Sequence, residues 1–147
     1  MNDGMSRKTS PEIMNRESLS QAEKALARMG ENYEEHVQVD LARLQKAFED
    51  LKPDSGNIEK QNNVFLISHN ISGLGDTFGY GLITIIGSSL CRFIERQNTL
   101  GRIDLEIILS HIEALKTVVD GKLKGEDHPE GQQILLKLKT ATGRDME

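Results

Sequence analysis

A histidine near the middle of the chain is followed at short intervals by glycines. His69 is followed by Ser72 three positions later, by Gly73 four positions later and by Gly79 ten positions later. An imidazole has an ordinary pKa near ~6.5, so at cellular pH it is mostly neutral and its ring nitrogen is a nucleophile. No strand pattern precedes Gly73 and no Gly-Lys-Ser/Thr sequence follows it, which excludes a loop that cradles the phosphates of a nucleotide.

The residues around His69 repeat with the period of a helix. At about 100° per residue, the side opposite His69 holds five apolar side chains: Val64, Ile67, Ile71, Leu74 and Phe78. The outward side, which includes His69, holds Ile58, Asn62, Phe65, Leu66, Ser72, Gly73 and Asp76. We therefore expect a helix over residues 58–78, ended by Gly79, that turns His69 to the solvent. Phe65 should be exposed, and Ile67 and Ile71 should be buried.

Two features of this outward side are unusual for a solvated helix surface. Gly73 lies one turn after His69, where a glycine inside a helix costs ~1 kcal/mol relative to alanine. The missing side chain leaves room beside the imidazole for a bound group. In addition, Ile58, Phe65 and Leu66 are apolar and flank the histidine, and such a patch is typical of a surface where a partner docks.

The rest of the chain predicts an all-α protein, because helical periodicity recurs and strand alternation is absent. We expect helices over residues 19–29 (ended by Gly30), 37–48, 58–78, 82–97, 103–120 and 129–140. The second to fifth should form an antiparallel up-down four-helix bundle, with the N-terminal helix and the short C-terminal helix added to it. This gives one domain over residues 11–142, a disordered N-terminus over 1–10 and a frayed C-terminus over 143–147.

Composition narrows the function classes. The 147 residues carry a formal net charge of −5, which argues against nucleic acid or an anionic membrane as the main partner. No stretch is long and apolar enough for a signal peptide or a membrane span, so a cytoplasmic protein is expected.

The single cysteine, Cys91, should lie opposite the core and have a structural role or none. His36 and His111, at the edges of apolar stripes, and His128, in a loop, have no partner at metal-ligand spacing, and no metal or cofactor is expected.

The run from His69 to Gly79 resembles the signature of histidine-containing phosphotransfer (HPt) domains, in which glycines follow the histidine at the fourth and tenth positions. The segment Leu90–Glu95 is similar to the next helix of that family, and the resemblance covers about residues 35–120. It implies a phosphorelay intermediate that accepts a phosphoryl group on His69 from the aspartyl-phosphate of a receiver domain and passes it to another receiver. Ile58, Asn62, Phe65, Leu66 and Asp76 would then dock the receiver, with Ser72, Gly73 and Gly79 supporting the site.

The resemblance further implies that partners supply the rest of the chemistry. Mg²⁺ would be bound by the receiver, and a sensor or hybrid histidine kinase would feed the relay. The chain would have no ATP site, would not be an enzyme in its own right and would act as a monomer. One position departs from the family, because Ser72 stands where a lysine is common. That departure keeps a second hypothesis open, a helical adaptor that binds receivers or kinases without transferring a phosphoryl group.

Overall fold

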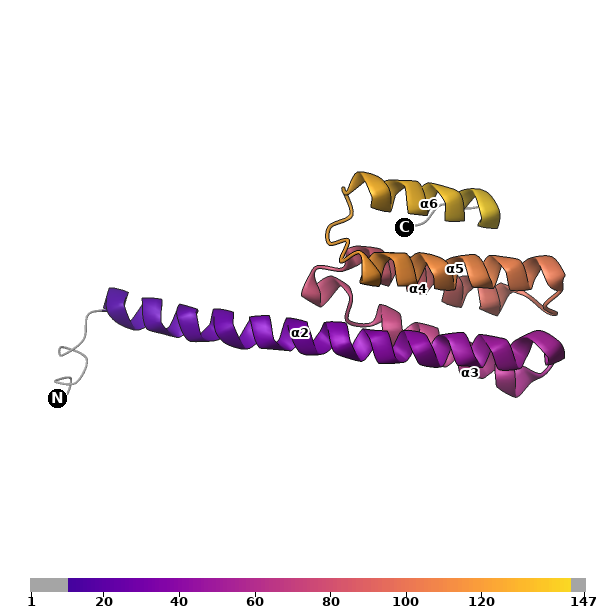
Figure 1. The fold of residues 1–147 in the computed structure, drawn as a ribbon, viewed down its shortest axis with the longest axis horizontal. Coiled ribbons are helices and arrows are strands. Elements are labelled where there is room, and N and C mark those ends of the chain that lie inside the picture. The colour runs from indigo at the N-terminus through magenta and orange to yellow at the C-terminus, as the bar shows by residue number, and fades with distance from the viewer. Residues whose placement is uncertain (1–10, 144–147) are drawn as a thin grey trace. The chain divides into compact units, whose positions relative to one another are not determined.

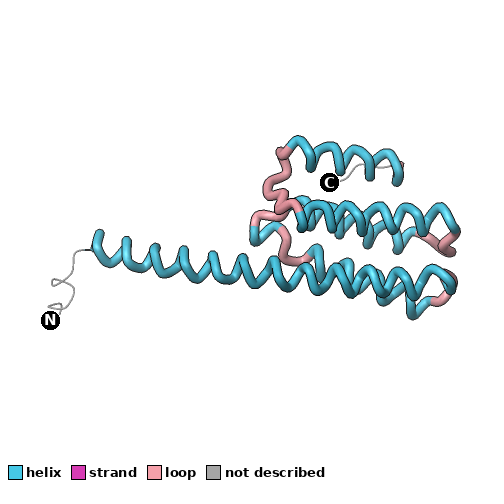
Figure 2. The backbone as a smooth tube through the Cα atoms, in the orientation of Figure 1, coloured by secondary structure: helices cyan, strands magenta, loops and turns pink. Residues whose placement is uncertain are grey.

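The computed structural model describes residues 11–143, with side chains from residue 15 onward, and this part of the chain is helical without strands (Figures 1 and 2). The α-helices are α2 (Pro11–Leu51), α3 (Ile58–Ser72), α4 (Gly81–Arg96), α5 (Arg102–Asp120) and α6 (Pro129–Thr142). Two short 3-10 turns, η1 (Lys52–Asp54) and η2 (Asp76–Phe78), flank α3. The all-α prediction is confirmed. The expectations for residues 1–10 and 144–147 lie outside the described residues, and Gly143 ends α6 with a left-handed backbone.

The contacts within the chain separate two compact units. The first extends to Glu35 and the second begins at His36. The helices that carry the predicted chemistry all belong to the second unit. There, α3 packs on α4, α4 on α5 and α5 on α6, and short loops join them (Figure 1).

Gly30 does not end a helix, which corrects the prediction of two separate helices before residue 51. The helix α2 runs through Gly30 without interruption and is 41 residues long. Glycine is a weak terminator unless it takes a left-handed backbone, and Gly30 is absent from the glycines that do so. The apolar stripe predicted in the first part of α2 is exposed, since Leu19, Leu26 and Met29 each keep more than half of their surface in solvent.

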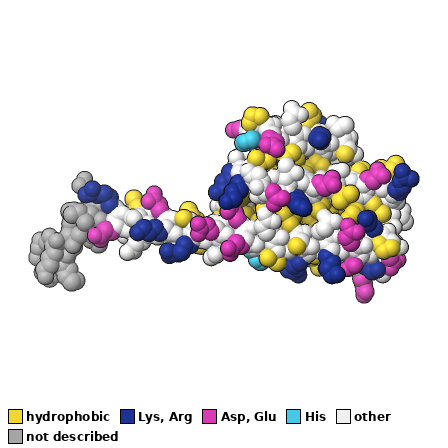
Figure 3. All heavy atoms as spheres, in the orientation of Figure 1, with side chains coloured by type: hydrophobic (Ala, Val, Ile, Leu, Met, Phe, Trp, Pro, Cys, Tyr) yellow, Lys and Arg dark blue, Asp and Glu magenta, His cyan; other side chains and the backbone are white. Residues whose placement is uncertain are grey.

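Apolar stripes of helical period form much of the core of the second unit, although Ile85, which the periodicity places in the stripe of α4, is only partly buried. The buried stripe residues are Val37, Leu41, Leu44 and Phe48 of α2, Leu82, Ile86, Ser89 and Phe93 of α4, and Ile108, Ile112, Leu115 and Val119 of α5. The limits of α4, α5 and α6 agree with the predicted ones to within two residues. On the face shown in Figure 3, basic and acidic side chains are interspersed.

His111 lies inside this core, which corrects its expected place at the edge of a stripe. It is fully buried, and its ring stacks on Phe93 with centroids 6.4 Å apart. Its Nδ1 is 2.8 Å from the backbone oxygen of Ile107, and its Nε2 is 3.0 Å from Ser89 Oγ. Because a carbonyl oxygen only accepts, Nδ1 donates to Ile107, and a neutral ring accepts from the Ser89 hydroxyl at Nε2. His111 is a core residue whose polar atoms are satisfied.

Candidate functional site

The site is built on α3, whose start is fixed by its own sequence. Asn57 caps the helix, since its side-chain oxygen accepts a hydrogen bond from the backbone N–H of Lys60 at 3.1 Å. Farther along, Val64, Ile67 and Ile71 face the core and are buried, as predicted. Burial of this stripe sets the rotation of α3 about its axis. His69, on the opposite side, is therefore exposed, and its predicted orientation is confirmed.

Phe65 lies against His69 but is less exposed than predicted. The two rings stack with centroids 6.2 Å apart and planes 7° from parallel. Phe65 is half-buried, because α4 approaches α3 at this position. Cys91 Sγ of α4 lies 3.7 Å from the backbone oxygen of Phe65. The stacked ring limits the imidazole's freedom to turn and leaves the outer edge of His69 in solvent.

Three large apolar side chains of α3 and of the turn after it are exposed. Ile58 and Leu66, on α3, keep 65% and 56% of their surface, and Leu74, in the turn after α3, keeps 51%. Asn62, between Ile58 and Leu66 on the same face, is also exposed. Leu74 was expected in the buried stripe, and that prediction is wrong because the helix ends before it. We call Ile58, Asn62, Leu66, His69 and Leu74 the His69 face.

Ser72 does not belong to this face, which corrects its predicted outward position. It is 8% exposed, and its hydroxyl donates to the backbone oxygen of His69 at 2.9 Å. The reason is the close approach of α4 at Gly87, where an added Cβ would lie 2.8 Å from the Cβ of Ser72. Since α4 covers this edge of α3, the serine hydroxyl is turned back onto its own helix and away from the solvent.

Gly73 ends α3 and does not lie inside a helix. The prediction that it is a costly glycine within a helix is therefore wrong. It is the C-cap residue of α3, has an ordinary helical backbone, and is exposed. A Cβ added there would meet nothing closer than 3.5 Å, the distance to the backbone oxygen of Asn70. The space beside His69 is thus open, but nothing in the packing requires a glycine at this position.

Gly75, which the sequence did not single out, is the glycine of this turn that packing requires. An added Cβ would lie 2.6 Å from both Thr84 Oγ1 and the backbone oxygen of Tyr80. Thr84 was also missed. Its hydroxyl joins the turn to α4, and no local motif points to a contact between residues so far apart in sequence.

The two remaining predicted residues lie in the 3-10 turn after Gly75. Asp76 is exposed at the first position of η2, so the helical periodicity that placed it on the face of His69 no longer applies. Gly79 has a left-handed backbone, φ +84°, and ends η2; the prediction that it ends the helix of His69 is wrong, because α3 already ends at Ser72. Lys60, the basic residue nearest to His69 in α3, pairs with Asp54 at 3.5 Å, at the other end of the helix.

Cys91 is buried in the contact of α4 with α3, which corrects its expected place opposite the core. The pKa of this thiol is raised from 9.0 to about 11, chiefly by burial; the charge of Glu95 also raises this pKa, and the charge of Arg92 lowers it. The raised pKa means that the thiol favours the folded state below pH ~9, and this contribution is lost as the pH rises toward 11. A structural role is consistent with these contacts.

We expect the thiol to react slowly in the folded chain. At pH 8, iodoacetamide should alkylate Cys91 at least ~10-fold more slowly in the native chain than in guanidinium, because both burial and the raised pKa suppress the thiolate. The rate in the native chain should increase as the pH approaches 11. Equal rates at pH 8, measured by intact mass, would mean that α3 and α4 separate readily.

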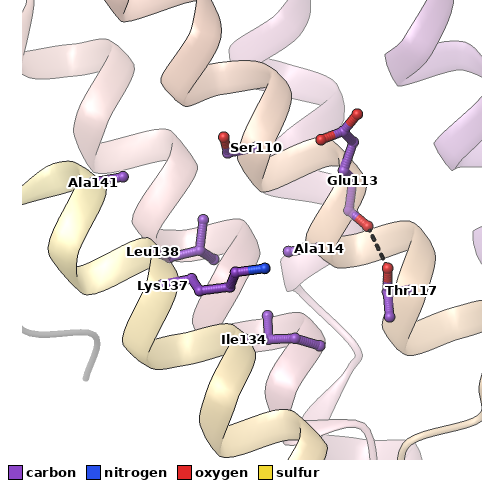
Figure 4. Close-up of a pocket in the computed structure, with 8 residues that line it drawn as sticks. All are labelled: Ser110, Glu113, Ala114, Thr117, Ile134, Lys137, Leu138 and Ala141. Carbon is purple, nitrogen blue, oxygen red and sulfur yellow. Dashed lines mark hydrogen bonds between the residues drawn. The ribbon is translucent and has the colours of Figure 1, made fainter.

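A groove between α5 and α6 contains none of the predicted site residues. It has a volume of about 310 Å³ and is lined by Ser110, Glu113, Ala114, Thr117, Ile134, Lys137, Leu138 and Ala141 (Figure 4). The hydroxyls of Ser110 and Thr117 donate to backbone oxygens of their own helix, at 3.0 and 2.9 Å. None of the residues that the sequence singles out for chemistry lines this groove, and His69 remains the candidate for chemistry.

Two kinds of feature are absent from the described part of the chain. No three side chains among its histidines, cysteines and carboxylates are grouped so that they could hold a metal ion. None of its helices combines the length and the apolar character needed to cross a bilayer. Comparison with protein-family models, with curated proteins and with solved structures finds no match to this chain. The assignment of function therefore depends on the geometry of the His69 face.

Proposed function

We propose that the chain is a phosphoryl carrier of the HPt type, in which His69 accepts a phosphoryl group from the aspartyl-phosphate of a receiver domain and passes it to another receiver. The observation that carries the proposal is an exposed imidazole on a helix whose opposite side is buried, with the exposed apolar side chains of Ile58 and Leu66 on the same side of that helix as His69. In this proposal the second half of α2 with α3, α4 and α5 forms the antiparallel four-helix bundle of such carriers.

The transfer step requires little from this chain beyond position. The lone pair of a neutral His69 ring nitrogen, Nε2, attacks the phosphorus as the bond from phosphorus to the aspartyl oxygen breaks. The carboxylate leaves with the electron pair, and the proton on the other ring nitrogen stays in place. Charge on the phosphoryl oxygens is stabilised by the Mg²⁺ and basic residues of the receiver. The chain itself then needs no ATP site and acts as a cytoplasmic monomer between a sensor or hybrid kinase and its receivers.

The His69 face supports this role by its shape and polarity. Phe65 stacks on the imidazole and limits its rotation, so the ring is held for in-line attack. Gly73 leaves the space one turn farther along the helix open to the phosphoryl group. The apolar side chains around the histidine would become buried against the receiver and exclude water from the reacting groups.

The position of Ser72 favours a second candidate, an adaptor that binds receivers or kinases without phosphoryl transfer. Its hydroxyl donates to the backbone of His69, so it contributes no hydrogen bond to a phosphoryl group, and no lysine takes its place. Either function uses the same docking face. The two differ only in whether His69 becomes phosphorylated.

The deciding experiment is phosphoryl transfer followed by intact mass and peptide mapping. The chain is mixed with a panel of phosphorylated receiver domains and Mg²⁺. One acid-labile phosphoryl group on the peptide that contains His69 would support the carrier. Binding of receivers without any phosphorylation would favour the adaptor.

A further inference from the structure

A hydroxyl group on α4 holds both ends of the turn that follows the helix of His69. Thr84 Oγ1 donates to the backbone oxygen of Ser72 at 2.9 Å and accepts from the backbone N–H of Asp76 at 3.0 Å. Ser72 is the last residue of α3 and Asp76 is the first of η2, so the two bonds enclose the turn Gly73–Gly75. The Ser72 carbonyl is among those at a helix C-terminus that have no partner within the helix.

The same turn is held by further contacts on its inner side. Gly75 is buried, and an added Cβ would lie 2.6 Å from Thr84 Oγ1. Its backbone oxygen accepts hydrogen bonds from the N–H of Tyr80 at 2.7 Å and of Phe78 at 3.2 Å. The backbone on both sides of Leu74 is therefore held in place, by Thr84 of α4 and by the residues that precede α4.

What this turn presents to the solvent is an apolar side chain. Leu74 is 51% exposed, five residues after His69, between two positions whose backbone is held in place. A rigidly held apolar side chain favours docking, because less conformational freedom is lost when the partner binds. A leucine on a free loop would lack this advantage.

We propose that Thr84 is a positioning residue for transfer between proteins: its hydroxyl holds Leu74 in the surface that receives the partner. This inference rests on the proposed function and adds a residue to it that does not contact the phosphoryl group. Thr84 acts on the association with the receiver and not on the reactivity of His69.

The test compares two phosphoryl donors of different size. Phosphoramidate needs no docking surface: Nε2 of His69 attacks phosphorus, the P–N bond breaks and ammonia leaves with the electron pair. In Thr84→Val, which loses the hydroxyl, we expect the KM for a phosphorylated receiver to rise about tenfold, because two backbone groups lose their partner and the turn loosens. The kcat and the rate with phosphoramidate should stay within about twofold of the parent chain. Thr84→Ser keeps a hydroxyl and should restore the parent KM.

Two further variants separate positioning from general damage. Thr117→Val removes a hydroxyl that donates only along its own helix, to the backbone oxygen of Glu113, and should change no parameter. Leu74→Ala should raise the KM by itself. Adding Thr84→Val to it should raise the KM no further, because both changes act through one side chain.

The other possible results overturn either the role of Thr84 alone or the proposed function as well. An unchanged KM in Thr84→Val, with transfer intact in the parent chain, overturns the role of Thr84 alone. Equal losses with both donors, or the loss of helical circular dichroism in Thr84→Val, make the hydroxyl a requirement for folding and also overturn it. A parent chain that accepts phosphate from neither donor overturns the proposed function and this inference with it.

Discussion

Replacing His69 with glutamine is expected to abolish phosphorylation of the chain and leave its fold intact. Glutamine has a similar length and polarity but no nucleophilic ring nitrogen, so a phosphorylated receiver should give no product above background. Because His69 is exposed, the variant loses chiefly the stacking of its ring on Phe65. The free energy of unfolding should therefore fall by about 1 kcal/mol or less. Radiolabel transfer and urea unfolding of the same preparations measure the two effects.

The matched control is His36→Gln. His36 is also an exposed histidine on a helix, and its ring lies 3.3 Å from the carboxylate of Asp40. It is not on the His69 face, and its replacement should leave transfer unchanged. Phosphorylation of His69→Gln at the parent rate would mean that another residue accepts the group, and the assignment of the site would be lost.

The parts of the fold that could be predicted are those where one apolar stripe determines the helix. The helices α4, α5 and α6 each carry such a stripe, and their limits agree closely with expectation. The outward orientation of His69 follows for the same reason, because Val64, Ile67 and Ile71 leave α3 only one rotation that buries them. Periodicity reports which side of a helix is apolar, and in these helices that side is the buried one.

The errors occur where contacts distant in sequence decide the local structure. At the end of α3, the hydroxyl of Thr84, twelve residues away, donates a hydrogen bond to the backbone oxygen of Ser72. The position of Ser72 depends on Gly87, whose missing side chain lets α4 approach. Gly30 is different: the sequence predicts that a helix ends there, but the helix continues through it at a cost of ~1 kcal/mol for one glycine.

The two glycines of the turn after α3 should respond to substitution in opposite ways. Gly75→Ala is expected to lower the free energy of unfolding by about 1–3 kcal/mol, as overpacking of a tight site does. The added methyl group would lie 2.6 Å from a backbone oxygen, that of Tyr80, and backbone cannot move aside cheaply. Gly73→Ala should change it by less than about 0.5 kcal/mol, because its backbone is helical and the nearest atom is 3.5 Å away. Urea unfolding followed by circular dichroism measures both.

The pair also separates two explanations of why glycine stands at each position. A glycine that packing requires affects stability first, whereas a glycine that leaves room for a phosphoryl group affects transfer alone. Gly73 should therefore be the functional one, and Gly73→Val should slow transfer with little loss of stability. If Gly73→Ala destabilises the chain as much as Gly75→Ala, the turn is more tightly packed around Gly73 than its open surroundings indicate. The space beside His69 would then be a consequence of folding and not of phosphoryl transfer.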